Sequence, residues 1–248
     1  MAVRAETYAP DRPVPYLVER EYTQTLQCPI RSTAEGALIE PTGGTVTITD
    51  PSGVVLVDAA AVTVASSVAY YVLTLAAASA LGEGYTVVWS LLIDGETYTF
   101  RLAAICCEYV PPNMVTAADL YGGEGIPELR YAVPQAQGER GDDVGWAPQI
   151  DAAYYSFIRR LLSDGRPIWL VREPTGYREW LLAQALVNAT RAIPSPEGSM
   201  WKQARTDAFH RMRRAEAGLR LQYSDEKSST RKGGVPPIWL APIGRPPW

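Results

Sequence analysis

Residue types that commonly carry out catalysis are scarce in this chain. Its 248 residues include one histidine, His210, and three cysteines, of which Cys106 and Cys107 are adjacent. A zinc site, a Ser-His-Asp triad or a Cys-His pair would need His210 as its imidazole. That histidine lies in a run of arginines, with no cysteine or paired carboxylates beside it. We therefore predict no catalytic residue, no metal site and no cofactor, and a protein that is not an enzyme.

The region 122–146 holds the other residues that could bind an ion. Asp142 and Asp143, with Glu139 nearby, offer oxygen ligands for a hard cation, but their spacing matches no calcium loop. The glycines of residues 122–125 lack the spacing of a phosphate-binding loop, and no strand leads into a helix there. We interpret this region as a long exposed loop.

The C-terminal segment 235–248 combines five prolines with large apolar side chains. The prolines exclude a helix or a central strand, yet the segment is too apolar for a solvated tail. We predict an extended arm that docks on a partner through Pro236, Pro237, Ile238, Trp239, Leu240, Ile243 and Trp248. Two interpretations stay open: the arm folds back onto its own helices, or it inserts into a partner with Trp239 and Trp248 as aromatic anchors.

An arginine cluster marks the polar side of a long predicted helix. Its members are Arg205, Arg211, Arg213, Arg214 and Arg220. Such a run is most often a solvated face, and the alternatives are contact with an acidic neighbouring subunit or with DNA phosphates. DNA contact is the weaker alternative, because no aromatic stacking residues are interleaved with the arginines and the chain is acidic as a whole.

Charge is divided along the chain. Residues 1–150 carry 7 Arg and 18 Asp and Glu, whereas residues 151–248 carry 16 Lys and Arg and 9 Asp and Glu, so a net charge of −4 resolves into −11 and +7. This asymmetry indicates two regions with different neighbours.

Hydrophobic alternation predicts a β-domain at residues 21–110. Strand patterns begin at Tyr22 and recur at 46–48, 54–57, 68–75, 85–93 and 96–105. The last two flank Asp94-Gly95, a strong hairpin signal. Short strands spaced by turns at this density are typical of an antiparallel β-sandwich.

The remaining segments predict arms, a linker and a helical bundle, so the fold class is α+β with several domains. Residues 1–20 are rich in proline and predict an extended arm. Residues 111–149 predict a linker with a short helix, capped by Thr116, and the acidic Gly-rich loop. Helical periodicity over residues 150–222 predicts three further helices, and residues 223–248 the extended C-terminal arm.

Neither export nor a membrane location is expected. The first residues carry charges and prolines rather than the apolar core of a signal peptide, and the weakly polar stretch 54–81 alternates like strands. Three cysteines in a chain of this length also favour a reducing compartment.

The order of elements in the helical region has a known counterpart. A short helix ending at Leu120 is followed by Pro127-Glu128-Leu129, by a helix from Ile150 to Leu162, and by the helix around 180–186. Over roughly residues 114–222 this order resembles the small helical head-to-tail connector, or adaptor, proteins of tailed bacteriophages. The predicted β-domain departs from the simplest members and is similar to the immunoglobulin-like modules that decorate phage structural proteins.

The resemblance implies a structural role in the neck of a virion. Family members form rings, commonly of twelve subunits, beneath the portal, pass DNA through the central channel, and often dock a C-terminal extension on the portal. Residues 235–248 are the matching extension. We therefore predict a homo-oligomeric ring that binds the portal protein and a tail or nozzle protein, with at most weak, non-specific contact to genomic DNA. It would be made in the bacterial cytoplasm and located in the virion neck.

Two other functions stay open. One is a different virion attachment protein, in a baseplate or at a fibre. The other is a carbohydrate-binding module that uses exposed aromatic residues among Tyr70, Tyr71, Tyr85, Trp89 and Tyr98. Strand alternation argues against the second, because it places about half of these rings in a core.

Overall fold

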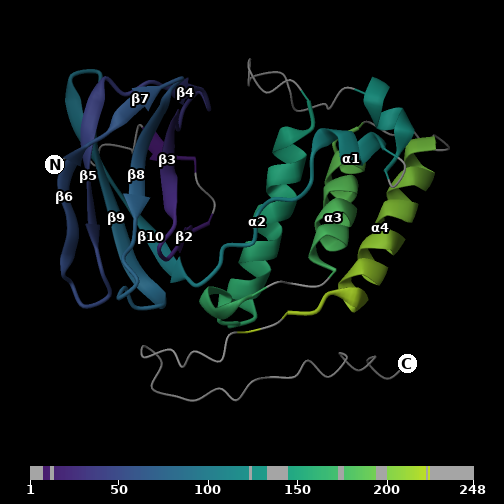
Figure 1. The fold of residues 1–248 in the computed structure, drawn as a ribbon. Helices are drawn as coiled ribbons and strands as arrows, with labels where there is room; N and C mark the ends of the chain where they lie inside the picture. Colours follow the sequence, from purple (N-terminus) through teal and green to yellow (C-terminus); the bar gives the residue numbers. More distant parts are fainter. Residues whose placement is uncertain are drawn as a thin grey trace. The chain divides into compact units, whose positions relative to one another are not determined.

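The computed structural model describes residues 8–11, 14–122, 125–132, 145–172, 176–193, 200–221 and 223. These residues belong to two compact units. Residues up to 110, together with 167–170, form a β unit, and the other described residues form a helical unit. The structure combines two β-sheets with four α-helices, so the predicted α+β class is confirmed (Figure 1).

Each sheet of the β unit has five strands. In the first sheet the order is β1 (Tyr8–Pro10), β3 (Thr23–Ser32), β8 (Val68–Thr74) and β7 (Thr63–Ala65), with β4 (Leu38–Ile39) also paired to β3. In the second sheet the order is β2 (Tyr16–Glu19), β10 (Glu96–Cys107), β9 (Gly82–Ile93), β5 (Gly43–Thr49) and β6 (Val55–Ala61). Strands β3, β5, β6, β8, β9 and β10 lie at the predicted positions.

The core of the β unit follows from strand alternation. From Tyr85 onward, every second residue of β9 is at most 3% exposed, namely Tyr85, Val87, Trp89, Leu91 and Ile93. The turn from β9 into β10 puts Asp94 at φ 51° and Gly95 at φ 80°, as a tight hairpin turn requires. The predicted hairpin is therefore confirmed.

The predicted N-terminal arm, residues 1–20, is wrong for residues 8–10 and 16–19, which form strands β1 and β2. Strand β1 pairs with β3, and β2 pairs with β10. Tyr16 is 2% exposed and Val18 1%, and the Tyr16 hydroxyl donates to the Gln27 carbonyl at 2.7 Å. The prolines misled the prediction: Pro10 ends an edge strand, where the absence of an amide donor is tolerated.

One strand pair also departs from the predicted antiparallel sheet. Strand β2 runs parallel to β10, with Ala104 opposite Tyr16 and Cys107 opposite Glu19. Parallel partners need a long connection, and most of the β unit lies between these two strands in sequence.

The helical unit comprises α1 (Ala117–Tyr121), a 3₁₀ turn η1 (Pro127–Tyr131), α2 (Ala147–Ser163), α3 (Tyr177–Arg191) and α4 (Met200–Gly218). Helix α3 packs against α1, α2 and α4 and is buried on most of its surface. A helix covered on several sides is apolar around most of its circumference. Figure 1 shows α2, α3 and α4 side by side.

Two boundaries of the predicted domains 111–149 and 150–222 need correction. Helix α2 starts at Ala147, because Pro148 suits a first turn and the adjacent Trp146 is buried, with its indole N–H donating to the Leu129 carbonyl at 3.1 Å. The 3₁₀ turn η2 (Ile168–Leu170) belongs to the β unit. There the Trp169 carbonyl accepts a hydrogen bond from the Glu108 amide at 2.9 Å.

Candidate functional site on helix α4

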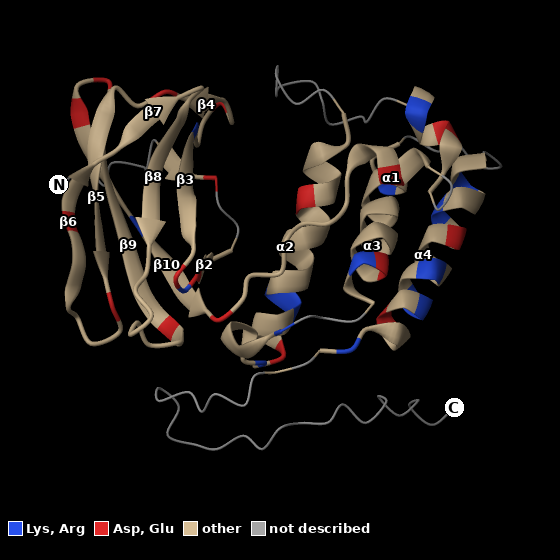
Figure 2. Cartoon of the chain, in the orientation of Figure 1, with Lys and Arg blue, Asp and Glu red and all other residues tan. Residues whose placement is uncertain are grey.

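Helix α4 carries four of the five predicted arginines opposite an apolar stripe, and Arg220 lies just beyond its end. Ala208 and Ala215 are each 3% exposed and lie on the buried side, followed by Leu219 at 9%. Small residues at this spacing allow α4 to approach α3 closely. The sequence of α4 is rich in cationic residues, and Figure 2 shows more Lys and Arg positions along α4 than along α2 or α3.

Arg205 does not lie on the open face of α4. Its Nη2 donates to the carbonyls of Thr190, at 3.0 Å, and Ile193, at 3.3 Å. These carbonyls lie at the C-terminal end of α3, where a cation interacts favourably with the helix dipole. Arg205 therefore joins α4 to the end of α3, and its guanidinium interacts with carbonyls of the same unit.

Arg220 has a similar local role just beyond the end of α4. Its Nη1 donates to the Ala217 carbonyl at 2.7 Å and to the Leu219 carbonyl at 3.2 Å. The side chain is exposed, so water competes for these bonds. Arg220 therefore bonds to carbonyls at the C-terminal end of α4, and we do not assign it to a binding surface.

Arg213 and Arg214 form the open part of the cluster, which we call the α4 basic face. Arg213 is exposed and its guanidinium carbon lies 4.8 Å from the centre of the Phe209 ring. Arg211 and Arg214 line a groove on another side of the helix. Of the five predicted arginines, Arg205 and Arg220 thus bond to carbonyls near helix ends, Arg213 and Arg214 are exposed, and Arg211 is half-buried beside the groove.

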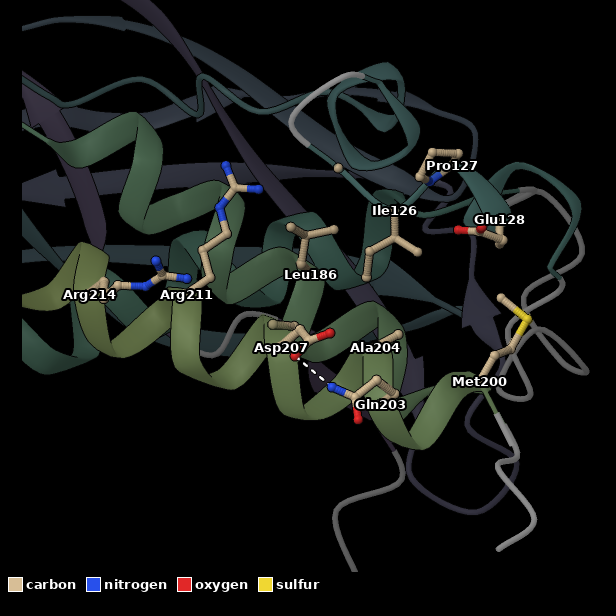
Figure 3. Close-up of a pocket in the computed structure, with 12 residues that line it drawn as sticks. Ile126, Pro127, Glu128, Leu186, Met200, Gln203, Ala204, Asp207, Arg211 and Arg214 are labelled. Atoms are coloured by element: carbon tan, nitrogen blue, oxygen red, sulfur yellow. Dashed lines mark hydrogen bonds between the residues drawn. The ribbon is translucent and has the colours of Figure 1, made fainter. Parts of the chain in front are cut away.

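The groove of about 480 Å³ lies between α4 and residues 125–128. Its apolar lining includes Ile126, Leu186 and Ala204. Figure 3 shows Glu128 near the Met200 end and the two arginines farther along α4.

Asp207 lies between those ends of the groove and accepts a hydrogen bond from Gln203 at 2.9 Å. Sequence reasoning missed this groove. The helical spacing of Met200, Gln203, Asp207, Arg211 and Arg214 is the signal that could have indicated it.

Other ion pairs of the helical unit were not predicted. Arg160 of α2 forms ion pairs with Glu216 of α4 and with Asp164, the residue that follows α2. Asp119 of α1 accepts hydrogen bonds from the backbone and hydroxyl of Thr116 and from Arg178 of α3, at 2.6 Å. The Thr116 bonds, with Arg178, hold the pKa of Asp119 below its usual value.

The thiols have the environment of structural residues. Cys28, Cys106 and Cys107 are buried, and none is in a disulfide. Burial raises the pKa of Cys106 to about 11 and raises that of Cys107 as well. A thiol is a nucleophile as the thiolate, so the raised pKa values of Cys106 and Cys107 disfavour their reaction at neutral pH.

Several predicted features fall outside the described residues. They are the docking arm with Pro236, Pro237, Ile238, Trp239, Leu240, Ile243 and Trp248, and the acidic residues Glu139, Asp142 and Asp143. In the part of the chain that the structure describes, no group of three or more His, Cys, Asp or Glu could hold a metal ion. Its helices also include none long and apolar enough to span a membrane.

The aromatic residues of the carbohydrate-binding alternative are partly core residues. Trp89 is fully buried and Tyr85 is 3% exposed, so neither could stack on a sugar. Tyr70, Tyr71 and Tyr98 are half-buried, and Tyr98 contacts Tyr8 edge to face at 4.9 Å. The carbohydrate-binding alternative needs exposed aromatic rings, and for Tyr85 and Trp89 this expectation is wrong.

Comparison with known proteins adds distant structural likenesses. No protein-family model and no curated protein matches the chain. Among solved structures, it is similar to E. coli alpha-2-macroglobulin (TM-score 0.31, 15% identity, over 43% of this chain and 6% of that one). It is also similar to the Lin-41 filamin domain (0.27, 14%, over 42% and 94%) and to domains 4 and 5 of the S-layer protein SbsC (0.25, 17%, over 41% and 51%). TM-scores this low carry no argument about function.

Proposed function

We propose that the chain is a structural protein of a tailed-phage virion: an adaptor ring of identical subunits that joins the portal to the tail and surrounds the DNA passage. Its β unit is an immunoglobulin-like sandwich, and residues 223–248 are an extended arm that reaches the portal. This assigns the protein to the virion neck and gives it no enzymatic activity.

The order of elements in the helical unit carries the proposal. Helix α1, the turn η1 and the antiparallel helices α2, α3 and α4 follow one another in the order on which the resemblance to connector proteins depends. The positions of α1 and η1 match the predicted short helix and the Pro127-Glu128-Leu129 segment. Elements at these positions support the proposal.

Charge supports contact between subunits through the α4 basic face. Arg213 and Arg214 are exposed, whereas Arg205 and Arg220 bond to carbonyls of their own unit. Carboxylates are spread over the strands and loops of the β unit, as Figure 2 shows. An acidic β unit of a neighbouring copy would complement the basic face, and such a contact closes into a ring when the rotation between copies allows it.

The test is the mass of the purified full-length chain, alone and with a portal protein, measured by light scattering and imaged by electron microscopy. We expect a ring with a mass twelve times that of one chain. A chain that stays monomeric with portal present, and that is absent from purified virions, would overturn the proposal. Replacing both Arg213 and Arg214 by Glu should weaken assembly, whereas Arg159→Glu, an exposed charge reversal on α2, should not.

A further inference from the structure

We propose that the groove between α4 and residues 125–128 holds the C-terminal segment 235–248 of the same chain. The inference rests on the proposed function, because it assigns a resting place to the arm that would reach the portal. It is tested on the isolated chain, where no portal is present, so its failure is separate from a failure of that function.

The lining of the groove suits an extended apolar peptide. Ile126, Leu186 and Ala204 provide apolar contacts, and the charged residues Glu128, Asp207, Arg211 and Arg214 line the groove beside them. Its volume of about 480 Å³ is in the range of pockets that bury small ligands, so it has room for Trp239 and a neighbouring apolar side chain. The segment itself is apolar apart from Arg245.

The order of charges defines a direction for the segment. A chain that returns from the end of α4 meets Arg214 and Arg211 first, then Asp207, and last Glu128 at the Met200 end. Within the segment, Trp239 lies six residues before Arg245. This places the indole against the guanidinium of Arg214, a favourable cation–π contact, and Arg245 beside Glu128.

The lengths agree with that direction. From Met200 to Arg214, α4 is about 21 Å long at 1.5 Å per residue. From Trp239 to Arg245, an extended proline-rich chain covers about 19 Å at 3.1 Å per residue. The residues between Tyr223 and Trp239 can span up to about 50 Å, far more than the return along α4 requires.

Docking on the same chain has a physical advantage. A short tether gives the segment an effective concentration in the millimolar range, so weak contacts suffice to keep it in the groove. The groove then covers Trp239 and its apolar neighbours, which as a free patch would promote association. A partner that binds the arm more tightly would displace it.

Disulfide trapping tests the location. In full-length protein carrying Met200→Cys and Gly244→Cys, we expect oxidation to form an intramolecular disulfide at least tenfold faster than in the control with Ala152→Cys and Gly244→Cys. Met200 and Ala152 are both exposed, and the native cysteines are buried and do not compete. Equal rates in the two variants, or a covalent dimer in place of the intramolecular product, would overturn the proposal.

A charge swap tests the direction. Glu128→Arg should slow trapping of the Met200→Cys and Gly244→Cys pair about threefold to fivefold, as expected for the loss of an exposed ion pair. Adding Arg245→Glu should restore the rate to within a factor of two. A double variant as slow as the single one would refute the assigned direction. Unchanged melting of each variant, followed by circular dichroism, shows that the fold is intact.

Discussion

Replacing Arg205 by methionine tests whether this residue joins α4 to the end of α3. Methionine keeps an unbranched stem of similar length and removes the guanidinium, which donates to the Thr190 and Ile193 carbonyls at 3.0 and 3.3 Å. We expect the variant to unfold more easily than the parent, and not merely to lose a binding surface.

The size of the loss follows from those contacts. Hydrogen bonds to charged groups contribute roughly 1.5–3 kcal/mol, and a cation near a helix C-terminus adds about 0.3–1 kcal/mol. Arg205 is half-buried, so water replaces part of this when the guanidinium is removed. We expect the free energy of unfolding of the helical unit to fall by about 2 kcal/mol, which lowers its melting temperature by about 10 °C for a unit near 100 residues.

Urea unfolding followed by circular dichroism at 222 nm measures this loss, because that signal comes mainly from the helices. Arg213→Met is the matched control. Arg213 is exposed and contacts only the Phe209 ring among the interactions described for it, so its removal should cost about 0.5 kcal/mol. If the losses for Arg205→Met and Arg213→Met agree within 0.5 kcal/mol, the assigned role of Arg205 is wrong.

Three further predictions follow from the two units. The pKa of Asp119 is lower in the folded chain than in the unfolded one, so its contribution to stability is present above pH 4 and is lost as pH falls through the folded value. The substitution Asp119→Asn should therefore lower the free energy of unfolding at pH 7 and flatten its dependence on acid pH, as measured by urea titrations. The three thiols should not react with Ellman's reagent at pH 8 in native protein and should all react in urea, and rapid reaction of the native protein would contradict the burial that raises the pKa of Cys106 to about 11. A Cβ at Gly44 would lie 2.4 Å from the Ser90 carbonyl oxygen, whereas a Cβ at Gly53 would meet no atom within 4 Å. In thermal unfolding, Gly44→Ala should therefore destabilise the protein by well over the roughly 1 kcal/mol expected for Gly53→Ala.

The sequence predicted the elements whose evidence is local. Alternation along residues 85–93 was sufficient to place β9 and its buried face, because side chains in a strand point to opposite sides in turn. The same holds for the apolar stripe of α4, in which Ala208 and Ala215 are buried as the helical period requires. Strands β1 and β2 were missed because their evidence is not local: their partners are β3 and β10, and prolines beside them indicated a free arm.

At the candidate site, too, local periodicity predicted part of the arginine cluster and tertiary contacts decided the rest. Periodicity placed it on the polar side of a helix, and this is correct for Arg213 and Arg214. Arg205 lies at the border of the apolar stripe, four residues after Trp201 and three before Ala208, a spacing that could have indicated its position. Its hydrogen-bond partners could not be read from the sequence, since they belong to the end of another helix.

By itself, the sequence determined the type and approximate position of most strands and helices and the charge division along the chain. These properties depend on residue type and on neighbours a few positions away. The tertiary structure alone decided that residues 8–10 join one sheet and residues 16–19 the other, that residues 167–170 belong to the β unit, and which arginines of α4 face outward. Those outcomes depend on backbone and side-chain contacts between residues far apart in the chain, which only folding brings together.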